Sequence, residues 1–205
     1  MTELILFAKA PRPGFVKTRL AAELGADTSC AAYRALLASL RINLQSLPSV
    51  TVQFTPSGAR SELEPLLPPH WRFACQAEGD LGIRLWSAFR QAFQREITRP
   101  VIIGSDCPYA TAEDIHAAWS ALEKSDTVFG PATDGGYWLI GVKKAPLELF
   151  TGIDWGTSRV LDQTLSRCRE LGLSTALLRT LDDIDTLADW RLFRDYLHAS
   201  QSLPE

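Results

Sequence analysis

Four cations lie close together in the stretch KAPRPGFVKTRL, residues 9–20, which contains no acidic residue: Lys9, Arg12, Lys17 and Arg19. Two prolines restrict the backbone there, and Gly14 allows a ligand to approach it closely. Arginine grips phosphate oxygens through paired hydrogen bonds, while lysine acts as a point charge. The stretch therefore predicts a site for the phosphates of a nucleotide, with a solvated basic turn as the alternative. It is not a Walker A loop, because Val16 and not glycine precedes Lys17.

The stretch VIIGSDCPYA, residues 101–110, places an acid directly after a buried strand. The run is apolar up to Gly104, Asp106 follows, and Pro108 prevents the strand from continuing. Carboxylate oxygen is the ligand that Mg²⁺ prefers, and protein-bound Mg²⁺ usually also contacts substrate phosphates. Asp106 is therefore predicted to bind Mg²⁺ or Mn²⁺ and to take part in catalysis, with Gly104 beside the nucleotide. The alternative is that Asp106 caps the following turn.

The stretch FGPATDGGYWLIG, residues 129–141, contains a glycine pair before a new strand. Gly135 and Gly136 let the backbone turn sharply and approach a ligand, and Tyr137 follows. These three residues are candidates for contact with an acceptor or a sugar. Asp134 precedes the turn and is a candidate base for an acceptor hydroxyl or a hydrogen-bonding group for a sugar. A plain Asp-Gly hairpin turn is the alternative.

The stretch LDDIDTLADW, residues 181–190, gathers acids at the end of a strand. Thr186 and Asp189 have the spacing of a capping box, which gives Thr186 a structural role. The three other acids repel one another unless a cation or hydrogen-bond donors intervene: Asp182, Asp183 and Asp185. We expect Asp185 to complete a metal site with Asp106.

Two further stretches give weaker signals. In QAEGDLGIRL, residues 76–85, Arg84 either reaches the nucleotide or simply belongs to the first turns of a helix. In DWGTSRVL, residues 154–161, Trp155 is a candidate for stacking against a base or sugar, and packing in the core is the alternative.

The elements that position these stretches alternate between strands and helices. Apolar runs of strand length, bounded by Pro, Gly or Asp, occur at residues 3–8, 50–54, 72–75, 101–104, 126–130, 137–142 and 174–178. Helical patterns lie between most of them, at residues 27–46, 80–96, 112–123, 157–171 and 186–198. Such alternation predicts an α/β fold with a mostly parallel sheet, whose ligands bind beyond the carboxyl ends of the strands.

Length and composition narrow the class of protein. With 205 residues, 46% of them hydrophobic, the chain is expected to form a single domain over residues 1–205. The net charge of -3 argues against a nucleic-acid partner, and the scattered 4 cysteines and 3 histidines argue against a zinc site. No apolar run approaches the ~18 residues of a membrane span, and no secretory signal precedes the first strand. We therefore expect a cytoplasmic location.

Taken together, six segments resemble a bacterial family of radical-SAM/selenodomain-associated glycosyltransferases, a domain of unknown function: FAKAPRPGFVKTRL, GDLGIRL, GSDCP, GPATDGGYWLIG, DWGTS and DDIDT. The resemblance spans nearly the whole chain, in order. It implies a three-layer α/β/α sandwich of the GT-A, nucleotide-diphospho-sugar transferase type. It also implies binding of a nucleoside diphosphate or triphosphate, usually with a divalent ion.

A more distant resemblance is to nucleotidyltransferases that guanylylate phospholactate or molybdopterin. On that pattern Asp106 and Asp185 would be the metal ligands, and Lys17 with Arg19 would face the phosphates. The chain departs from both models: Gly104 stands at the first acidic position of the D-x-D motif, and the glycine-rich G-x-G-x-R loop is replaced by proline and lysine.

The expected function is that of a metal-dependent transferase that uses a nucleotide-activated donor, specifically a nucleotide-sugar glycosyltransferase. Two alternatives remain open at this point. One is a nucleotidylyltransferase that releases pyrophosphate. The other is a binding module without catalysis, either for nucleotides or, through the basic loop, for an acidic protein partner. The acceptor and the oligomeric state are not specified by any motif.

Overall fold

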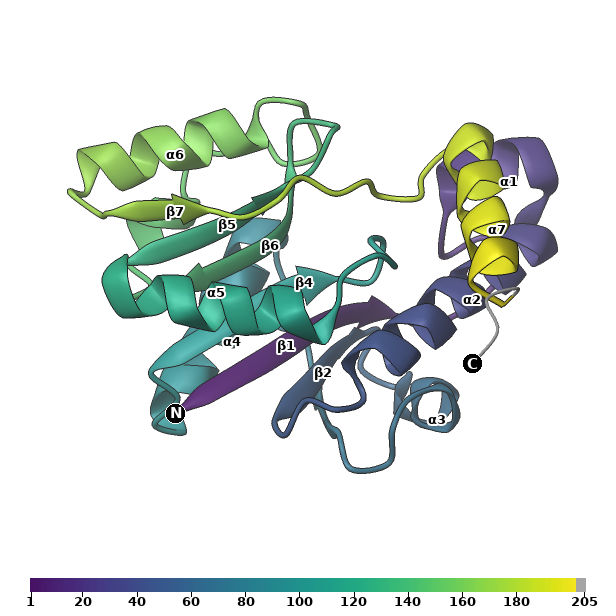
Figure 1. Ribbon diagram of the computed structural model, residues 1–205, viewed down its shortest axis with the longest axis horizontal. Helices are drawn as coiled ribbons and strands as arrows, with labels where there is room; N and C mark the ends of the chain where they lie inside the picture. The colour runs from purple at the N-terminus through teal and green to yellow at the C-terminus, as the bar shows by residue number, and fades with distance from the viewer. Residues whose placement is uncertain (202–205) are drawn as a thin grey trace.

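The computed structural model describes residues 1–201, and within them the strands form one seven-stranded sheet in the order β3-β2-β1-β4-β6-β5-β7 (Figure 1). The strands are β1 (Thr2–Lys9), β2 (Val50–Thr55), β3 (Arg72–Cys75), β4 (Arg99–Gly104), β5 (Thr127–Pro131), β6 (Tyr137–Val142) and β7 (Thr175–Leu177). Only β6 runs antiparallel to its neighbours among these described strands. The predicted α/β fold with a mostly parallel sheet is confirmed.

Helices cover both faces of this sheet. They are α1 (Thr18–Leu24), α2 (Ala26–Leu44), α3 (Arg60–Leu63), α4 (Leu81–Gln94), α5 (Ala112–Lys124), α6 (Val160–Glu170) and α7 (Leu187–Gln201), with 3-10 turns η1 (Glu64–Leu66) and η2 (Leu147–Phe150). One hydrophobic cluster joins the sheet to α2, α5 and α7, and a second joins its other face to α4, η2 and α6. The three layers that the sequence implied are therefore present.

The helix α4 shows how the sequence pattern produces one of these layers. Its buried residues Leu85, Ala88, Phe89 and Ala92 recur at helical spacing and pack in the cluster that contains Ile102 of β4. The side chain of Asp80 caps the helix by accepting a hydrogen bond of 2.9 Å from the amide of Ile83.

Helix α1 differs from the sequence-based expectation, which treated residues 9–20 as a loop. Lys17 adopts the left-handed conformation, with φ 48° and ψ 48°, and the chain turns from there into seven helical residues. Leu20 is the residue of this helix that is buried, and no side-chain oxygen caps its start. A helix this short, without an apolar stripe or a capping residue, leaves no periodic signal in the sequence.

The segment between β7 and α7 crosses the carboxyl ends of the central strands and brings α7 against α1 (Figure 1). Backbone hydrogen bonds fix this crossing: the amide of Leu181 donates to Pro131 over 3.1 Å, and that of Ile184 donates to Asp106 over 2.9 Å. The acids of residues 182–185 are thereby held over the end of β4. Among residues 1–201, no helix is long and apolar enough to cross a membrane.

Candidate functional site

A pocket of about 460 Å³ opens at the carboxyl ends of β1 and β4, where an α/β sheet of this kind binds its ligands. Residues of β1, β4, β6, α1 and α4 line it, together with Asp185 from the crossing segment. One part of the wall is apolar, with Phe7, Leu85 and Ile102, and another is charged, with Lys17 and Asp106. A ligand with an apolar or aromatic part and an anionic part would match both walls.

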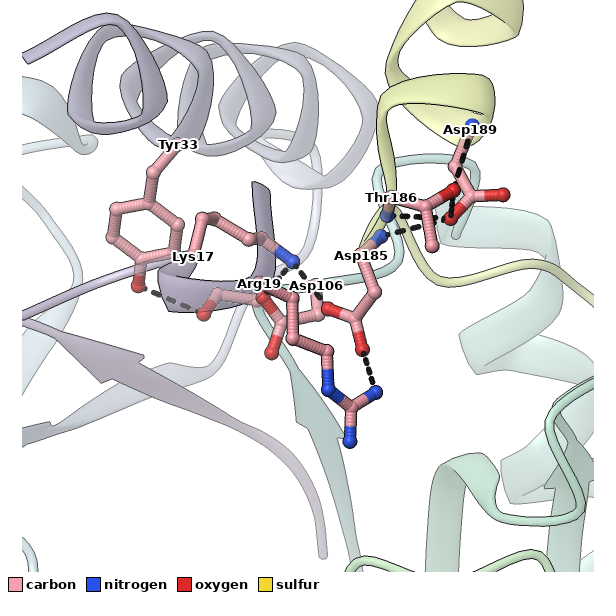
Figure 2. A network of polar contacts seen from close by, with 8 residues as sticks. Lys17, Arg19, Tyr33, Asp106, Asp185, Thr186 and Asp189 are labelled. Atoms are coloured by element: carbon pink, nitrogen blue, oxygen red, sulfur yellow. Dashed lines mark hydrogen bonds and ion pairs between the residues drawn. The ribbon is translucent and has the colours of Figure 1, made fainter. Parts of the chain in front are cut away.

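Lys17 lies at the centre of the charged wall (Figure 2). Its side chain is only 2% exposed, and its ammonium contacts Oδ1 of Asp106 and lies 3.3 Å from Oδ1 of Asp185. The guanidinium of Arg19 reaches the other oxygen of Asp185 over 3.1 Å, and the Arg19 side chain is 69% exposed. Two carboxylates from distant segments therefore converge on one buried cation.

The backbone around each charged residue explains this convergence. Lys17 directs its side chain inward from the first residue of the turn into α1. Asp185 is held by the cap of α7, because the carboxylate of Asp189 accepts hydrogen bonds from the amides of Asp185 and Thr186, over 3.1 and 2.7 Å (Figure 2). The predicted capping role of Thr186 and Asp189 is confirmed, since the Asp189 amide also donates to Oγ1 of Thr186.

Tyr33 and Ser105 support the loop that carries Asp106, and no sequence motif predicts this role for either residue. The Tyr33 hydroxyl lies 2.8 Å from Oγ of Ser105 and accepts a hydrogen bond of 2.9 Å from the amide of Lys9. Burial raises the pKa of Tyr33, and the charge of Asp106 adds to this effect, so the phenol stays protonated. In the sequence Tyr33 has the same helical spacing as the core residues of α2, so no pattern distinguishes it from them.

Asp183 is a second residue whose role the sequence did not single out among three acids. Burial and, after it, the charge of Asp106 raise the pKa of Asp183 to about 7, while Lys17 opposes the shift. Near neutral pH the carboxyl is therefore protonated in a substantial share of molecules. This proton reduces the repulsion between the acids that the crossing segment brings together.

Eight of the predicted site residues line the pocket: Lys9, Lys17, Arg19, Arg84, Gly104, Asp106, Tyr137 and Asp185. They come from β1, α1, α4, β4, β6 and the crossing segment, so the fold gathers residues that lie far apart in the sequence. Arg84 is held by a hydrogen bond of 2.9 Å from its Nε to the carbonyl of Gly79.

Arg12, Gly14 and Trp155 lie outside the residues that line the pocket. Arg12 forms a paired contact with Glu62, 2.6 Å from NH2 to Oε1 and 3.0 Å from Nε to Oε2. Trp155 packs with the hydrophobic cluster around α4, where the lack of a side chain at Gly82 makes room for its indole. Packing, the alternative left open for Trp155, is the arrangement seen.

The turn between β5 and β6 also lies outside the pocket lining. Oδ1 of Asp134 accepts a hydrogen bond of 2.8 Å from the amide of Gly136, which closes the turn. Gly135 has a φ of 88°, and a side chain there would collide with the carbonyl of Ser158. The turn thus packs through Gly135 against Ser158, and Asp134 acts on the site through its charge, which contributes to the raised pKa of Asp183.

The carboxylates of the charged wall, Asp106 and Asp185, are the candidate ligands for a divalent cation. Within the part of the chain that the structure describes, no group of three or more His, Cys, Asp or Glu side chains is arranged to hold a metal ion. Mg²⁺, however, is commonly held by one or two carboxylates, with substrate phosphates and water completing its six ligands. Asp106 and Asp185 converge on one cation position and fit a divalent ion that binds together with phosphates.

Residues 39–157 match the family model described as "Uncharacterized protein conserved in bacteria (DUF2064)". The chain belongs to this family. A candidate nucleotide-diphospho-sugar transferase from Desulfovibrio desulfuricans G20, known from a crystal structure, is 33% identical in sequence to this DUF2064 protein. The match covers 94% of this chain and 85% of that one, and the TM-score is 0.87. No curated protein matches the chain.

More distant structures share the fold of this DUF2064 protein. The CMP:2-keto-3-deoxy-manno-octonic acid synthetase complexed with CTP is 9% identical, with 98% of this chain and 99% of that one covered and a TM-score of 0.61. The manganese complex of Rv0371c from Mycobacterium tuberculosis H37Rv is 14% identical, with 95% and 99% covered and a TM-score of 0.55. The fold of nucleotide-diphospho-sugar transferases is thus shared, while the radical-SAM association of the resemblance stays a prediction.

Proposed function

We propose that this DUF2064 protein is a transferase that uses a nucleotide-activated donor together with a divalent cation, and that the donor is a nucleotide sugar. The observation that carries the proposal is the convergence of Asp106 and Asp185 on the ammonium of Lys17 at the carboxyl ends of the strands. The likeness to the candidate nucleotide-diphospho-sugar transferase of D. desulfuricans supports the same donor class.

Each charged side chain of the pocket has a role in this proposal. Asp106 and Asp185 would hold the divalent ion, Mg²⁺ or Mn²⁺. Lys17 and Arg19 would hold the phosphates, and the exposed guanidinium of Arg19 is free to turn toward them. Arg84 and Lys9 add positive charge at the pocket wall. The apolar wall formed by Phe7 and Leu85 would receive the nucleoside.

The chemistry follows from the placement of these charges. A bound divalent ion would neutralise negative charge as it develops on the departing diphosphate. Lys17 and Arg19 would stabilise the same charge electrostatically, which is the main contribution a protein makes to reactions of this type. Tyr33 and Ser105, which also line the pocket, keep the loop of Asp106 in place through their hydrogen bond.

A specific observation favours nucleotidyl transfer as the second candidate function. Asp134, the candidate base for an acceptor hydroxyl, closes its own turn outside the pocket lining. A phosphate acceptor would need no such base. In that reaction the acceptor phosphate attacks the α-phosphorus of a nucleoside triphosphate, and the bond to the leaving pyrophosphate breaks.

The products distinguish the two reactions. The protein would be incubated with radiolabelled nucleotide sugars and, separately, with nucleoside triphosphates, each with Mg²⁺ or Mn²⁺ and a mixture of small-molecule acceptors. Release of nucleoside diphosphate from a nucleotide sugar supports glycosyl transfer, and release of pyrophosphate supports nucleotidyl transfer. Calorimetry with the four nucleoside diphosphates, with and without Mg²⁺, tests binding itself. An absence of binding with every nucleotide would refute both forms of the proposal.

A further inference from the structure

Lys17 occupies the position between Asp106 and Asp185 at which a divalent ion would meet its ligands. We propose that Lys17 controls when the metal binds. In the nucleotide-free protein its ammonium neutralises both carboxylates, and the phosphates of an incoming nucleotide draw it away, which frees the two carboxylates for the metal. This inference rests on the proposed function, because it requires that phosphates enter the pocket.

The contacts of Lys17 make simultaneous occupancy unfavourable. Its ammonium contacts Oδ1 of Asp106 and is 3.3 Å from Oδ1 of Asp185, while Oδ2 of Asp185 faces Arg19. Mg²⁺ would require carboxylate oxygens at about 2.0–2.1 Å. A divalent ion that took Oδ1 of either aspartate would lie next to the ammonium, whose side chain is 2% exposed, and like charges so close repel each other.

The side chain of Lys17 is suited to change partners while its backbone stays fixed. Its carbonyl accepts the hydrogen bond of 2.8 Å from Ala21 that opens α1, and its backbone is set by the left-handed turn. The lysine side chain is a flexible four-carbon stem that ends in a point charge, so it can pair with an anion in many geometries. Arg19 and Lys9 line the same pocket, so a phosphate bound beside them would lie within the reach of the lysine.

Electrostatics explain why a nucleotide is needed for the exchange. If the buried ammonium left without a replacement, Asp106 would lose its cation and Asp185 would keep only Arg19, beside the carboxyl of Asp183. The side chains of Asp106 and Asp185 are 46% and 35% exposed, so water offsets only part of the attraction to Lys17 that they would lose. Phosphates would supply a new partner for Lys17, and the metal would take over its former partners. Nucleotide and metal would then each increase the affinity for the other.

The test measures binding of Mn²⁺ alone to the full-length protein, without nucleotide, from the electron paramagnetic resonance signal of the free ion. We expect Lys17→Met to bind Mn²⁺ at least about tenfold more tightly than wild type, within the range of couplings between sites. Lys17→Arg keeps the charge and should bind as weakly as wild type. Lys9→Met removes one positive charge from the same pocket without removing a contact to either carboxylate, and its affinity should change much less.

A further variant locates the metal. Adding Asp106→Asn to Lys17→Met should abolish the gain in Mn²⁺ affinity. The inference is overturned if folded Lys17→Met binds Mn²⁺ no more tightly than wild type, or if the gain survives the loss of Asp106. It is also overturned if Lys9→Met gains as much as Lys17→Met, because the effect would then reflect net charge and not the two contacts.

Wild-type protein provides a measurement that does not depend on the folding of a variant. Its Mn²⁺ affinity is measured with and without a saturating nucleoside diphosphate, chosen from UDP, CDP, GDP and ADP by calorimetry without metal. A rise of about tenfold or more with nucleotide, corrected for Mn²⁺ bound by the nucleotide in buffer, is expected. Equal affinity in both conditions overturns the inference. An absence of binding of all four diphosphates refutes the proposed function instead, while the nucleotide-free comparison of variants still decides whether Lys17 blocks the metal.

Discussion

The backbone amide of Ile184 donates a hydrogen bond of 2.9 Å to the carbonyl of Asp106. The side chain of Ile184 is 1% exposed and belongs to the hydrophobic cluster under α2 and α5. The segment that carries Asp183 and Asp185 is therefore anchored beside Asp106 by its main chain and by an apolar side chain. Charge attraction is not the sole force that assembles the site, so removing a carboxylate should change its chemistry more than its fold.

Asp106→Asn tests this separation of chemistry from fold. We expect turnover to fall by at least about 100-fold, because the amide is a poor ligand for the metal that would neutralise the departing diphosphate. The thermal unfolding midpoint should stay near that of wild type, because the buried ammonium of Lys17 keeps Asp185 as its partner. Product release and circular dichroism on the same preparation measure the two effects.

The matched control for this variant is Asp182→Asn on the segment between β7 and α7. The carboxylate of Asp182 accepts a hydrogen bond of 2.7 Å from Oγ1 of Thr133 and lies outside the pocket lining. An asparagine oxygen can accept the same bond, so turnover should remain close to that of wild type. If both variants lost activity equally, general loss of negative charge, and not ligation by Asp106, would be responsible.

Asp183 should make stability depend on pH in a defined direction. Its pKa is raised from 3.8 to about 7 in the folded protein, so the folded state binds the proton more tightly than the unfolded chain does. The stabilising contribution is full below pH ~4 and is lost as the pH rises through ~7. It amounts to at most about 4 kcal/mol.

Asp183→Asn should remove this dependence, because the amide resembles the protonated acid and cannot ionise. The variant should exceed wild type in free energy of unfolding at pH 8.5 and should approach it at pH 5, as measured by urea denaturation. A difference of the same size at both pH values would contradict the assigned protonation of Asp183.

Much of the sheet could be predicted from the sequence, because its strands are apolar runs with clear limits. The differences between prediction and structure have physical causes. The sequence predicts a strand over 101–104, with Pro100 as its boundary, whereas β4 begins at Arg99. Pro100 belongs to the strand, because it pairs with Glu3 in the parallel ladder. The antiparallel direction of β6 is set by the tight turn at Gly135 and not by any property of the strand itself.

The site was predictable only to the extent that strand ends gather at one edge of the sheet. That rule placed Asp106 correctly in the pocket wall, and Lys17 and Asp185 also lie there. The same rule does not predict which cation of residues 9–20 points into the pocket. Arg12 turns to Glu62, which lies 50 residues further along the chain, and such a pairing leaves no local signal.

Asp134→Asn distinguishes a turn-forming role from a catalytic one. Asparagine can still accept the hydrogen bond from the amide of Gly136, so stability should be retained, and so should turnover if Asp134 only closes the turn. Asp134→Ala loses that bond and should lower the free energy of unfolding by about 1 kcal/mol. Urea denaturation and product release measure the pair. Retained stability of Asp134→Asn with a large loss of turnover would instead identify Asp134 as the base.

Gly135→Ala tests whether the turn between β5 and β6 and residues 156–158 form one rigid wall. Gly135 has φ 88°, and a methyl group there would collide with the carbonyl of Ser158. Gly156 provides a matched comparison, because its φ is 80° and a methyl group there would meet nothing within 4 Å. Gly156→Ala should therefore cost about 1–2 kcal/mol of unfolding free energy, from backbone strain alone.

Gly135→Ala should lower the free energy of unfolding by the same backbone strain as Gly156→Ala, about 1–2 kcal/mol. It should lower it by about 1–3 kcal/mol more, because the methyl group would displace the backbone of Ser158. The shift would also move Leu161, whose amide donates a hydrogen bond of 3.0 Å to the carbonyl of Gly135 at the start of α6. Urea denaturation of the two variants separates strain from collision, since only the difference between them reports the contact. If Gly135→Ala and Gly156→Ala lost the same free energy of unfolding, the β5–β6 turn and the backbone of Ser158 would move apart without cost. The turn would then be free to reach the pocket.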